Sequence, residues 1–183
     1  MKLLVHSCDS RKHILAHWIR FFKRSSWAVE PVYIQGEALW SDQLIQALTL
    51  ISDEYVWYTL DDYFIAEDID WEWWEYLAVD MNMDALRVQP IVQENSLPYL
   101  FKKEGELLKQ TPDSPYQNSC ATSIWKREYL LNSLKPCMNP WQWETWTPEK
   151  FGNVYFVPGL PFWYTDGTKK GQYRKRGLKM ITE

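Results

Sequence analysis

The sequence predicts an α/β fold, namely one Rossmann-like domain in which a mostly parallel central sheet is flanked by helices. Strand and helix signals alternate along the first half of the chain, which is the arrangement that gives a doubly wound sheet. Of the 183 residues, 46% are hydrophobic and 24% are charged, as in an ordinary globular domain. No repeat or linker divides the chain, so we expect residues 1–183 to form a single domain.

Four apolar runs in the first half predict strands, and three segments between them carry apolar residues at helical spacing. The strands are expected over residues 2–8, 29–35, 54–60 and 85–92, and the helices begin near residues 11, 41 and 69. Ser10 and Ser41 are the predicted N-caps of the first two helices. In the third helix, Ile69, Trp73 and Leu77 have the spacing of a core-facing stripe. This order places the turns after the first and third strands at one edge of the sheet, where ligands bind in such folds.

The second half is less regular. A strand and a short helix are expected over residues 99–110, and a longer helix over 119–134. Asn139 is the predicted cap of a short helix starting at Pro140, because proline suits a first helical turn. A last strand is expected over 154–157.

The net charge of −4 conceals two segregated blocks. Between Ser25 and Leu86 there are fourteen Asp and Glu residues and no Lys or Arg, whereas 169–179 holds six basic residues and no acid. The basic C-terminal segment, 167–183, is either a solvated tail or a lid that closes over an anion. The candidates for phosphate binding, one of them outside this segment, are Lys169, Lys170, Arg174, Arg176 and Lys126.

Other features narrow the class of protein. No apolar run is long enough to span a bilayer, and the apolar start is too short for a signal peptide, so we expect no stable membrane insertion.

The three cysteines, Cys8, Cys120 and Cys137, are odd in number and show no CxxC spacing. A disulfide framework or a zinc site is therefore not indicated, and a reducing cytoplasm is expected.

The third predicted strand ends in two adjacent carboxylates, Asp61 and Asp62. Two like charges this close are costly unless a cation lies beside them. Mn²⁺ and Mg²⁺ prefer carboxylate oxygens and keep open positions for phosphates. The pair therefore indicates a divalent metal site, with a solvated loop or a helix cap as the alternative.

Three motifs span most of the chain up to about Thr147. They are the first strand with Ser7-Cys8-Asp9-Ser10, then Leu60-Asp61-Asp62-Tyr63-Phe64, then residues 121–131 followed by Asn139-Pro140-Trp141-Gln142-Trp143-Glu144. In this order and spacing they resemble small bacterial and phage glycosyltransferases of the GT-A (nucleotide-diphospho-sugar transferase) superfamily. The resemblance implies a GT-A fold, a nucleotide-diphosphate sugar donor, and a cytoplasmic enzyme of a bacterium or a phage-infected host cell.

The resemblance also implies roles for individual residues. Asp61 and Asp62 stand where that superfamily has an Asp-x-Asp metal motif, although here the two acids are adjacent. Asp62 is the expected direct ligand of Mn²⁺ or Mg²⁺, and Asp61 is expected at the ribose or behind the metal. Ser7 and Asp9, which follow the first strand, are expected to face the nucleobase or the ribose.

An inverting sugar transfer needs a base that takes the proton of the acceptor hydroxyl. Glu144 is the expected base, and Trp141 and Trp143 beside it are expected to stack on an acceptor sugar. A Glu in the first turn of a helix is also a common partner of the helix dipole, which is the alternative role.

Two other functions stay open at this stage. A glycoside hydrolase uses two carboxylates without metal or nucleotide, for instance Asp62 and Glu144. A nucleic-acid-binding module would use the basic run 171–176 with its tyrosine. The acceptor of a transferase is a glycan or a modified DNA base. The donor sugar, its nucleotide and the oligomeric state do not follow from the sequence. The sequence also does not decide between an inverting and a retaining transfer, and in a retaining transfer Glu144 would need another role.

Overall fold

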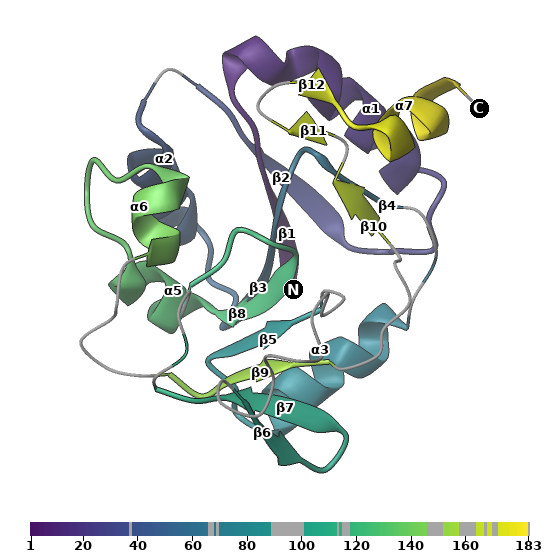
Figure 1. The fold of residues 1–183 in the computed structure, drawn as a ribbon. Helices are drawn as coiled ribbons and strands as arrows, with labels where there is room; N and C mark the ends of the chain where they lie inside the picture. Colours follow the sequence, from purple (N-terminus) through teal and green to yellow (C-terminus); the bar gives the residue numbers. More distant parts are fainter. Residues whose placement is uncertain are drawn as a thin grey trace.

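The computed structural model shows a central sheet with helices on both faces (Figure 1). It describes residues 1–36, 38–65, 68, 70–88, 101–112, 114, 118–145, 152–157, 164–166, 168–169 and 172–182.

The described residues form an eight-stranded sheet in the order β2-β1-β3-β8-β5-β9-β7-β6. The strands are β1 (Lys2–His6), β2 (Glu30–Ile34), β3 (Tyr55–Leu60), β5 (Ala85–Arg87), β6 (Phe101–Glu104), β7 (Leu107–Gln110), β8 (Ser123–Lys126) and β9 (Val154–Phe156). β1 pairs in parallel with β2 and β3, and β5 with β9, while β8 lies antiparallel between β3 and β5. The α/β class is confirmed, but the sheet is mixed rather than mostly parallel because of β8, β7 and β6.

Helices and two small antiparallel ladders complete the described fold. The helices are η1 (Asp9–Arg11), α1 (Lys12–Phe22), α2 (Trp40–Leu50), α3 (Trp71–Asp80), α5 (Arg127–Ser133), α6 (Pro140–Thr145) and α7 (Lys175–Thr182). The ladders pair β4 (Tyr63–Ile65) with β10 (Tyr164–Asp166), and β11 (Thr168–Lys169) with β12 (Gln172–Tyr173). Figure 1 shows α2, α5 and α6 together on one side, with α1 and α7 adjacent on the other.

Both faces of the central strands are buried, because successive side chains of a strand point to opposite faces. Leu3 and Val5 of β1 pack in one apolar cluster that includes residues of α1 and α3. Leu4 between them packs in a second cluster with residues of α2, α5 and α6. A strand buried on both faces reads as a continuous apolar run, which is how β1 and β3 look in the sequence.

The helix starts differ from the sequence prediction. The N-cap positions of α1 and α2 are Arg11 and Leu39, not Ser10 and Ser41, and neither makes a side-chain cap hydrogen bond. The Ser41 hydroxyl instead accepts a hydrogen bond from the Met138 backbone N–H at 2.9 Å. A tertiary contact, and not a local helix cap, therefore determines the hydrogen bond of the Ser41 side chain.

The buried face of α3 also differs. Asp70 caps the helix by accepting a hydrogen bond from the Trp73 backbone N–H at 3.0 Å. Trp71 and Ala78 are buried, whereas Trp73 is 48% exposed. Ile69 lies outside the described residues. Leu77 packs against the core as predicted, but Trp73 does not. Trp73 was placed wrongly because aromatic residues at four of the first six helix positions offered two apolar faces.

Two segments of the second half fold as strands. Residues 101–110 form the β6–β7 hairpin, whose turn uses Gly105 at φ +61°, a conformation that favours glycine. In the predicted helix over 119–134, residues 123–126 form β8 and only 127–133 are helical. The Asn139 cap is confirmed, since its Oδ1 accepts a hydrogen bond from the Gln142 N–H at 2.8 Å.

Candidate functional site

The candidate site lies where β1 and β3 end. The two strands run in parallel with His6 opposite Leu60, so Ser7 and Asp61 leave the sheet side by side. The Asp61 backbone N–H donates to the His6 carbonyl at 3.1 Å, which fixes the start of the turn. This confirms that the two polar turns meet at one edge of the sheet.

A charged cluster of four side chains forms at this edge. The Ser7 hydroxyl donates a hydrogen bond to Asp61 Oδ2 at 2.5 Å. One nitrogen of Arg11, Nη2, lies 2.6 Å from Asp61 Oδ1 and 2.9 Å from Asp62 Oδ2. The Asp61 side chain is fully buried, whereas Asp62 is 17% and Arg11 29% exposed. The carboxylate at the centre of the cluster is therefore fully buried, and the Asp62 and Arg11 side chains are partly buried.

Arg11 is the functional residue that sequence reasoning missed. It belongs to η1, directly after the turn that follows β1, and its backbone N–H donates to the Cys8 carbonyl at 2.8 Å. The feature of the sequence that could have identified Arg11 is its position as the first basic residue after that turn. Only the fold shows that this turn lies next to the end of β3.

Burial raises the pKa of the Asp61 carboxyl from 3.8 to about 6, because the charged form loses its hydration. The neighbouring charge of Asp62 raises it further, while the Arg11 guanidinium and the Ser7 hydrogen bond lower it. The site therefore contains a carboxyl that titrates just below neutral pH.

The residues at this edge, as arranged, do not fit the expected Mn²⁺ or Mg²⁺. Both oxygens of Asp61 are engaged, one by Ser7 and one by Arg11, and Arg11 also contacts Asp62. Among the described residues there is no group of three or more His, Cys, Asp or Glu side chains that could hold a metal ion. The cation beside the two carboxylates in this structure is a guanidinium.

Glu144 lies at the same edge. Its Oε1 accepts a hydrogen bond from the Cys120 backbone N–H at 2.7 Å. The pKa of the Cys120 thiol is raised by burial first, and then by the charges of both Glu144 and Asp62. Because both carboxylates act on one thiol, α6 brings Glu144 near the end of β3, although its Oε1 is held by backbone.

The two tryptophans of α6 have different positions. Trp141 is 64% exposed and can present its ring to a ligand. Trp143 is fully buried, its Nε1 donates to the Ser133 hydroxyl at 3.0 Å, and its ring packs on Trp40 and Trp125. The expectation that Trp143 contacts an acceptor is corrected, since no face of its ring is free.

Lys126 lies at the wrong edge of the sheet. It is opposite Tyr55, at the start of β3, and its Nζ donates to Asn82 Oδ1 at 2.7 Å. Asp61 follows the end of β3, roughly 20 Å away at strand rise. Lys126 cannot therefore contact a ligand held at Asp61, and that expectation is corrected.

Asp9 and the C-terminal segment lie around the cluster. Asp9 is exposed and pairs with Lys12 at 3.2 Å, so its carboxylate is accessible from solvent. β10 pairs with β4 so that Asp166 lies opposite Tyr63, the residue after Asp62. The fold thus brings the basic C-terminal segment beside the carboxylates.

Tyr173 and Arg174 belong to the part of the C-terminal segment that the structure describes. The pKa of Tyr173 is raised by partial burial and then by the charge of Asp61, and its ring meets those of His13 and His17 edge-on. Arg174, the next residue, is exposed. Lys170 lies outside the described residues.

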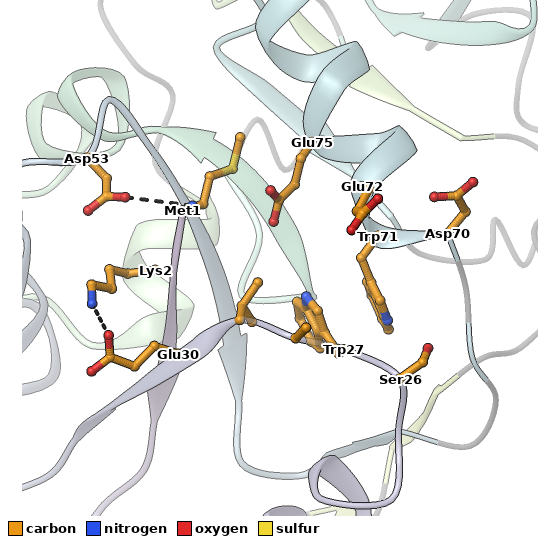
Figure 2. A pocket seen from close by; sticks show the side chains of 12 residues that line it. Met1, Lys2, Ser26, Trp27, Glu30, Asp53, Asp70, Trp71, Glu72 and Glu75 are labelled. Carbon is orange, nitrogen blue, oxygen red and sulfur yellow. Dashed lines mark hydrogen bonds and ion pairs between the residues drawn. The ribbon is translucent and has the colours of Figure 1, made fainter.

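A cavity of about 550 Å³ opens at the opposite edge of the sheet, near the starts of β1, β3 and α3 (Figure 2). Trp27 and Trp71, stacked at 3.9 Å between ring centroids, form part of its wall. Met1, Asp53 and Glu75 are among its other lining residues. This cavity is separate from the carboxylate cluster.

The fold is that of the nucleotide-diphospho-sugar transferases, a GT-A-like fold shared by sugar transferases and nucleotidyltransferases. Among solved structures the chain is similar to A197 from STIV, with a TM-score of 0.54 and 14% identity over 87% of this chain and 83% of that one. It is similar to S. aureus TarS, with a TM-score of 0.58 and 13% identity over 90% of this chain but 36% of that one. It is also similar to the inositol-1-phosphate CTP transferase from T. maritima, with a TM-score of 0.53 and 6% identity over 99% and 94%.

Identities this low establish the fold and not the activity. No protein-family model and no curated protein matches the chain. Within the part of the chain that the structure describes, no helix is long and apolar enough to cross a membrane.

Proposed function

We propose that this protein is a glycosyltransferase that moves a sugar from a nucleotide-diphosphate donor to an acceptor hydroxyl. The observation that carries the proposal is the Ser7–Asp61–Asp62–Arg11 cluster at the carboxyl ends of β1 and β3. In open α/β sheets ligands bind at this edge. The sugar-transferase-like fold supports the same conclusion.

The donor would lie across this edge. Ser7 and Asp9 would contact its nucleoside, and the buried Asp61 would hold Ser7 and Arg11 in place. Arg11 with Arg174 would contact its diphosphate, because guanidinium groups match phosphate oxygens well. Lys170 is assigned to the same diphosphate from its place in the chain. These cations would offset the negative charge that develops on the leaving diphosphate.

The acceptor would approach from α6. Its hydroxyl oxygen forms a bond to the anomeric carbon while the bond between that carbon and the diphosphate oxygen breaks. The hydroxyl proton passes to Glu144, and the nucleoside diphosphate leaves with the bonding electrons. Trp141, whose ring is exposed, would stack on the acceptor. This chemistry inverts the sugar configuration.

Donor binding is tested by measuring the melting temperature of the full chain with each of a panel of nucleotide sugars. Each sugar is added with and without Mn²⁺, in a reducing buffer like that of the cytoplasm. A donor should raise the melting temperature of the natural protein and fail to do so in Asp62→Ala. Glu106→Ala, which removes an exposed acid in the β6–β7 turn, is the matched control and should keep the shift. A larger shift with Mn²⁺ would support the predicted metal.

The same assay separates other activities. Stabilisation by a nucleoside triphosphate, with pyrophosphate release on adding a sugar phosphate, would identify a nucleotidyltransferase, which has this fold too. Glycan cleavage at a rate that neither nucleotides nor EDTA change would identify a hydrolase. A DNA acceptor requires binding that weakens as salt rises, since phosphate contacts release counterions.

A further inference from the structure

Helix α3 carries aromatic and acidic side chains together on its solvent side. Trp73, Tyr76 and Val79 are 48%, 57% and 49% exposed. The rings of Trp73 and Tyr76 are stacked, with 5.7 Å between their centroids. Glu72 and Asp80 are exposed on the same side as Tyr76, because helical residues four apart lie one above the other. These five residues are called the α3 face below.

The composition of the α3 face selects a basic partner. Carboxylates attract Lys and Arg, and so do the faces of exposed aromatic rings, which stabilise a cation through their electron density. The segment that contains α3 supplies no such cation, since there is no Lys or Arg between Ser25 and Leu86. The surface that fits the α3 face therefore presents Lys or Arg beside an apolar side chain.

Helix α7 of the same chain presents a surface of this kind. Lys175, Leu178 and Lys179 are exposed, and their spacing of three and four residues places them on one face of the helix. These three residues are called the α7 face. It belongs to the block 169–179, which holds six basic residues and no acid. The two charge blocks of the sequence thus meet solvent as an acidic helix face and a basic one.

The two helices cover the same face of the sheet but do not lie together. Leu77 of α3 and Met180 of α7 both pack against one apolar core cluster, so both helices lie on its side of the sheet. Figure 1 shows α7 next to α1, with α3 well away from both. Two molecules that meet through this side about a two-fold axis can place α3 of each copy against α7 of the other. The same contact is then made twice, as in a closed symmetric dimer.

We propose that this protein forms a two-fold dimer in which the α3 face of each copy binds the α7 face of the other copy. Lys175 and Lys179 pair with the acids of the α3 face, and Leu178 packs on its two stacked rings. Forming one of the two contacts brings the other within reach, which strengthens the association. The dimer uses no residue assigned to the donor or the acceptor, so the inference does not rest on the proposed function.

Reversal of the charges on both faces tests the proposal. Analytical ultracentrifugation of the full chain should show a monomer–dimer equilibrium that shifts toward monomer as salt rises. Glu72→Lys combined with Asp80→Lys should weaken dimerisation at least about tenfold, because like charges then face one another. Lys175→Glu combined with Lys179→Glu should do the same. An equal mixture of the two double variants should dimerise again, since every contact between them joins opposite charges.

Glu106→Lys combined with Glu128→Lys is the matched control. It changes the net charge as much as the α3 double variant does, at two exposed acids outside the α3 face. Its dimerisation should stay within about twofold of the natural protein, since isolated surface charges contribute little. Tyr76→Ser removes an exposed ring without changing the charge and should weaken dimerisation about tenfold. It carries the test if circular dichroism shows that a double variant does not fold.

A natural protein that stays monomeric at low salt would overturn the proposal, and the α3 face would then fit a basic segment of another protein. A mixture of the folded double variants that stays monomeric would overturn it too, because the two faces would not meet each other. Equal weakening in the control would show an effect of overall charge and have the same consequence. No nucleotide sugar enters these measurements, so their failure leaves the proposed function unaffected.

Discussion

Replacing Asp61 by Asn should change how the stability of the fold depends on pH. The Asp61 carboxyl has a pKa of about 6 in the folded chain, against 3.8 for the exposed group. Between these two pH values the folded state holds more protons than the unfolded state. The stabilisation is therefore complete below about pH 4 and is lost as the pH rises through 6.

The expected size follows from the shift. About two pKa units correspond to roughly 3 kcal/mol in the free energy of unfolding. His6 acts in the opposite sense, because burial lowers its pKa from 6.5 to about 4 and its folded state holds fewer protons. His6 therefore adds stability as the pH rises from about 4 to 6.5, also by roughly 3 kcal/mol. In the natural protein the two effects largely cancel.

The assay is urea unfolding at pH 4, 5, 6 and 7, followed by the fluorescence of the twelve tryptophans. From pH 4 to 7, the stability of Asp61→Asn relative to the natural protein should rise by roughly 3 kcal/mol. His6→Gln is the counterpart, and its relative stability should fall over the same range. Each variant removes one of two opposing titrations, so the pair tests sign as well as size.

Parallel stability curves for Asp61→Asn and the natural protein would refute the reasoning. They would mean that the Arg11 ion pair and the Ser7 hydrogen bond offset the burial of the carboxyl completely. A fall in the relative stability of Asp61→Asn would be a stronger contradiction, since it requires a lowered pKa.

Three further variants test the site. Trp143→Ala should cost about 3–5 kcal/mol in the free energy of unfolding, because it leaves a cavity and removes the hydrogen bond that the Ser133 hydroxyl accepts. Replacing the exposed Trp141 by Ala should change it by less than about 0.5 kcal/mol in the same urea assay. Lys126→Ala should leave the donor-induced thermal shift unchanged, and a lost shift would contradict its place at the far edge. Glu144→Gln should reduce transfer by about 10²- to 10⁴-fold while the donor still binds, as measured by product formation and calorimetry, and an unchanged rate would exclude its role as base.

Part of the site could be predicted from local pattern. Strand β3 runs directly into Asp61, and the apolar character of β1 and β3 predicted that their following turns share an edge, as the Ser7–Asp61 hydrogen bond confirms. A strand buried on both faces is apolar throughout, so its polar end is visible in the sequence. The capped helix at Asn139 is a similar case, because a cap depends on residues three positions apart.

Contacts between distant segments could not be predicted in this way. β8 was predicted as helix, because four residues are too short to show strand alternation beside a genuine helix. Trp143 was predicted at the surface, and only the packing of α6 on Trp40 and Trp125 buries it. Lys126 carries a suitable charge, but strand direction places it away from Asp61.

The amino-acid sequence by itself determined the α/β class, the first three strands with the helices between them, and the carboxylates at the end of β3. These are properties of neighbouring residues, since the period of apolar side chains follows from local backbone geometry. The tertiary structure alone decided that Arg11 meets Asp61 and Asp62, and that Tyr173 lies close enough for the charge of Asp61 to act on it. Partners 50 and more residues apart are chosen by the order of strands in the sheet, and that order is fixed by packing of the whole chain.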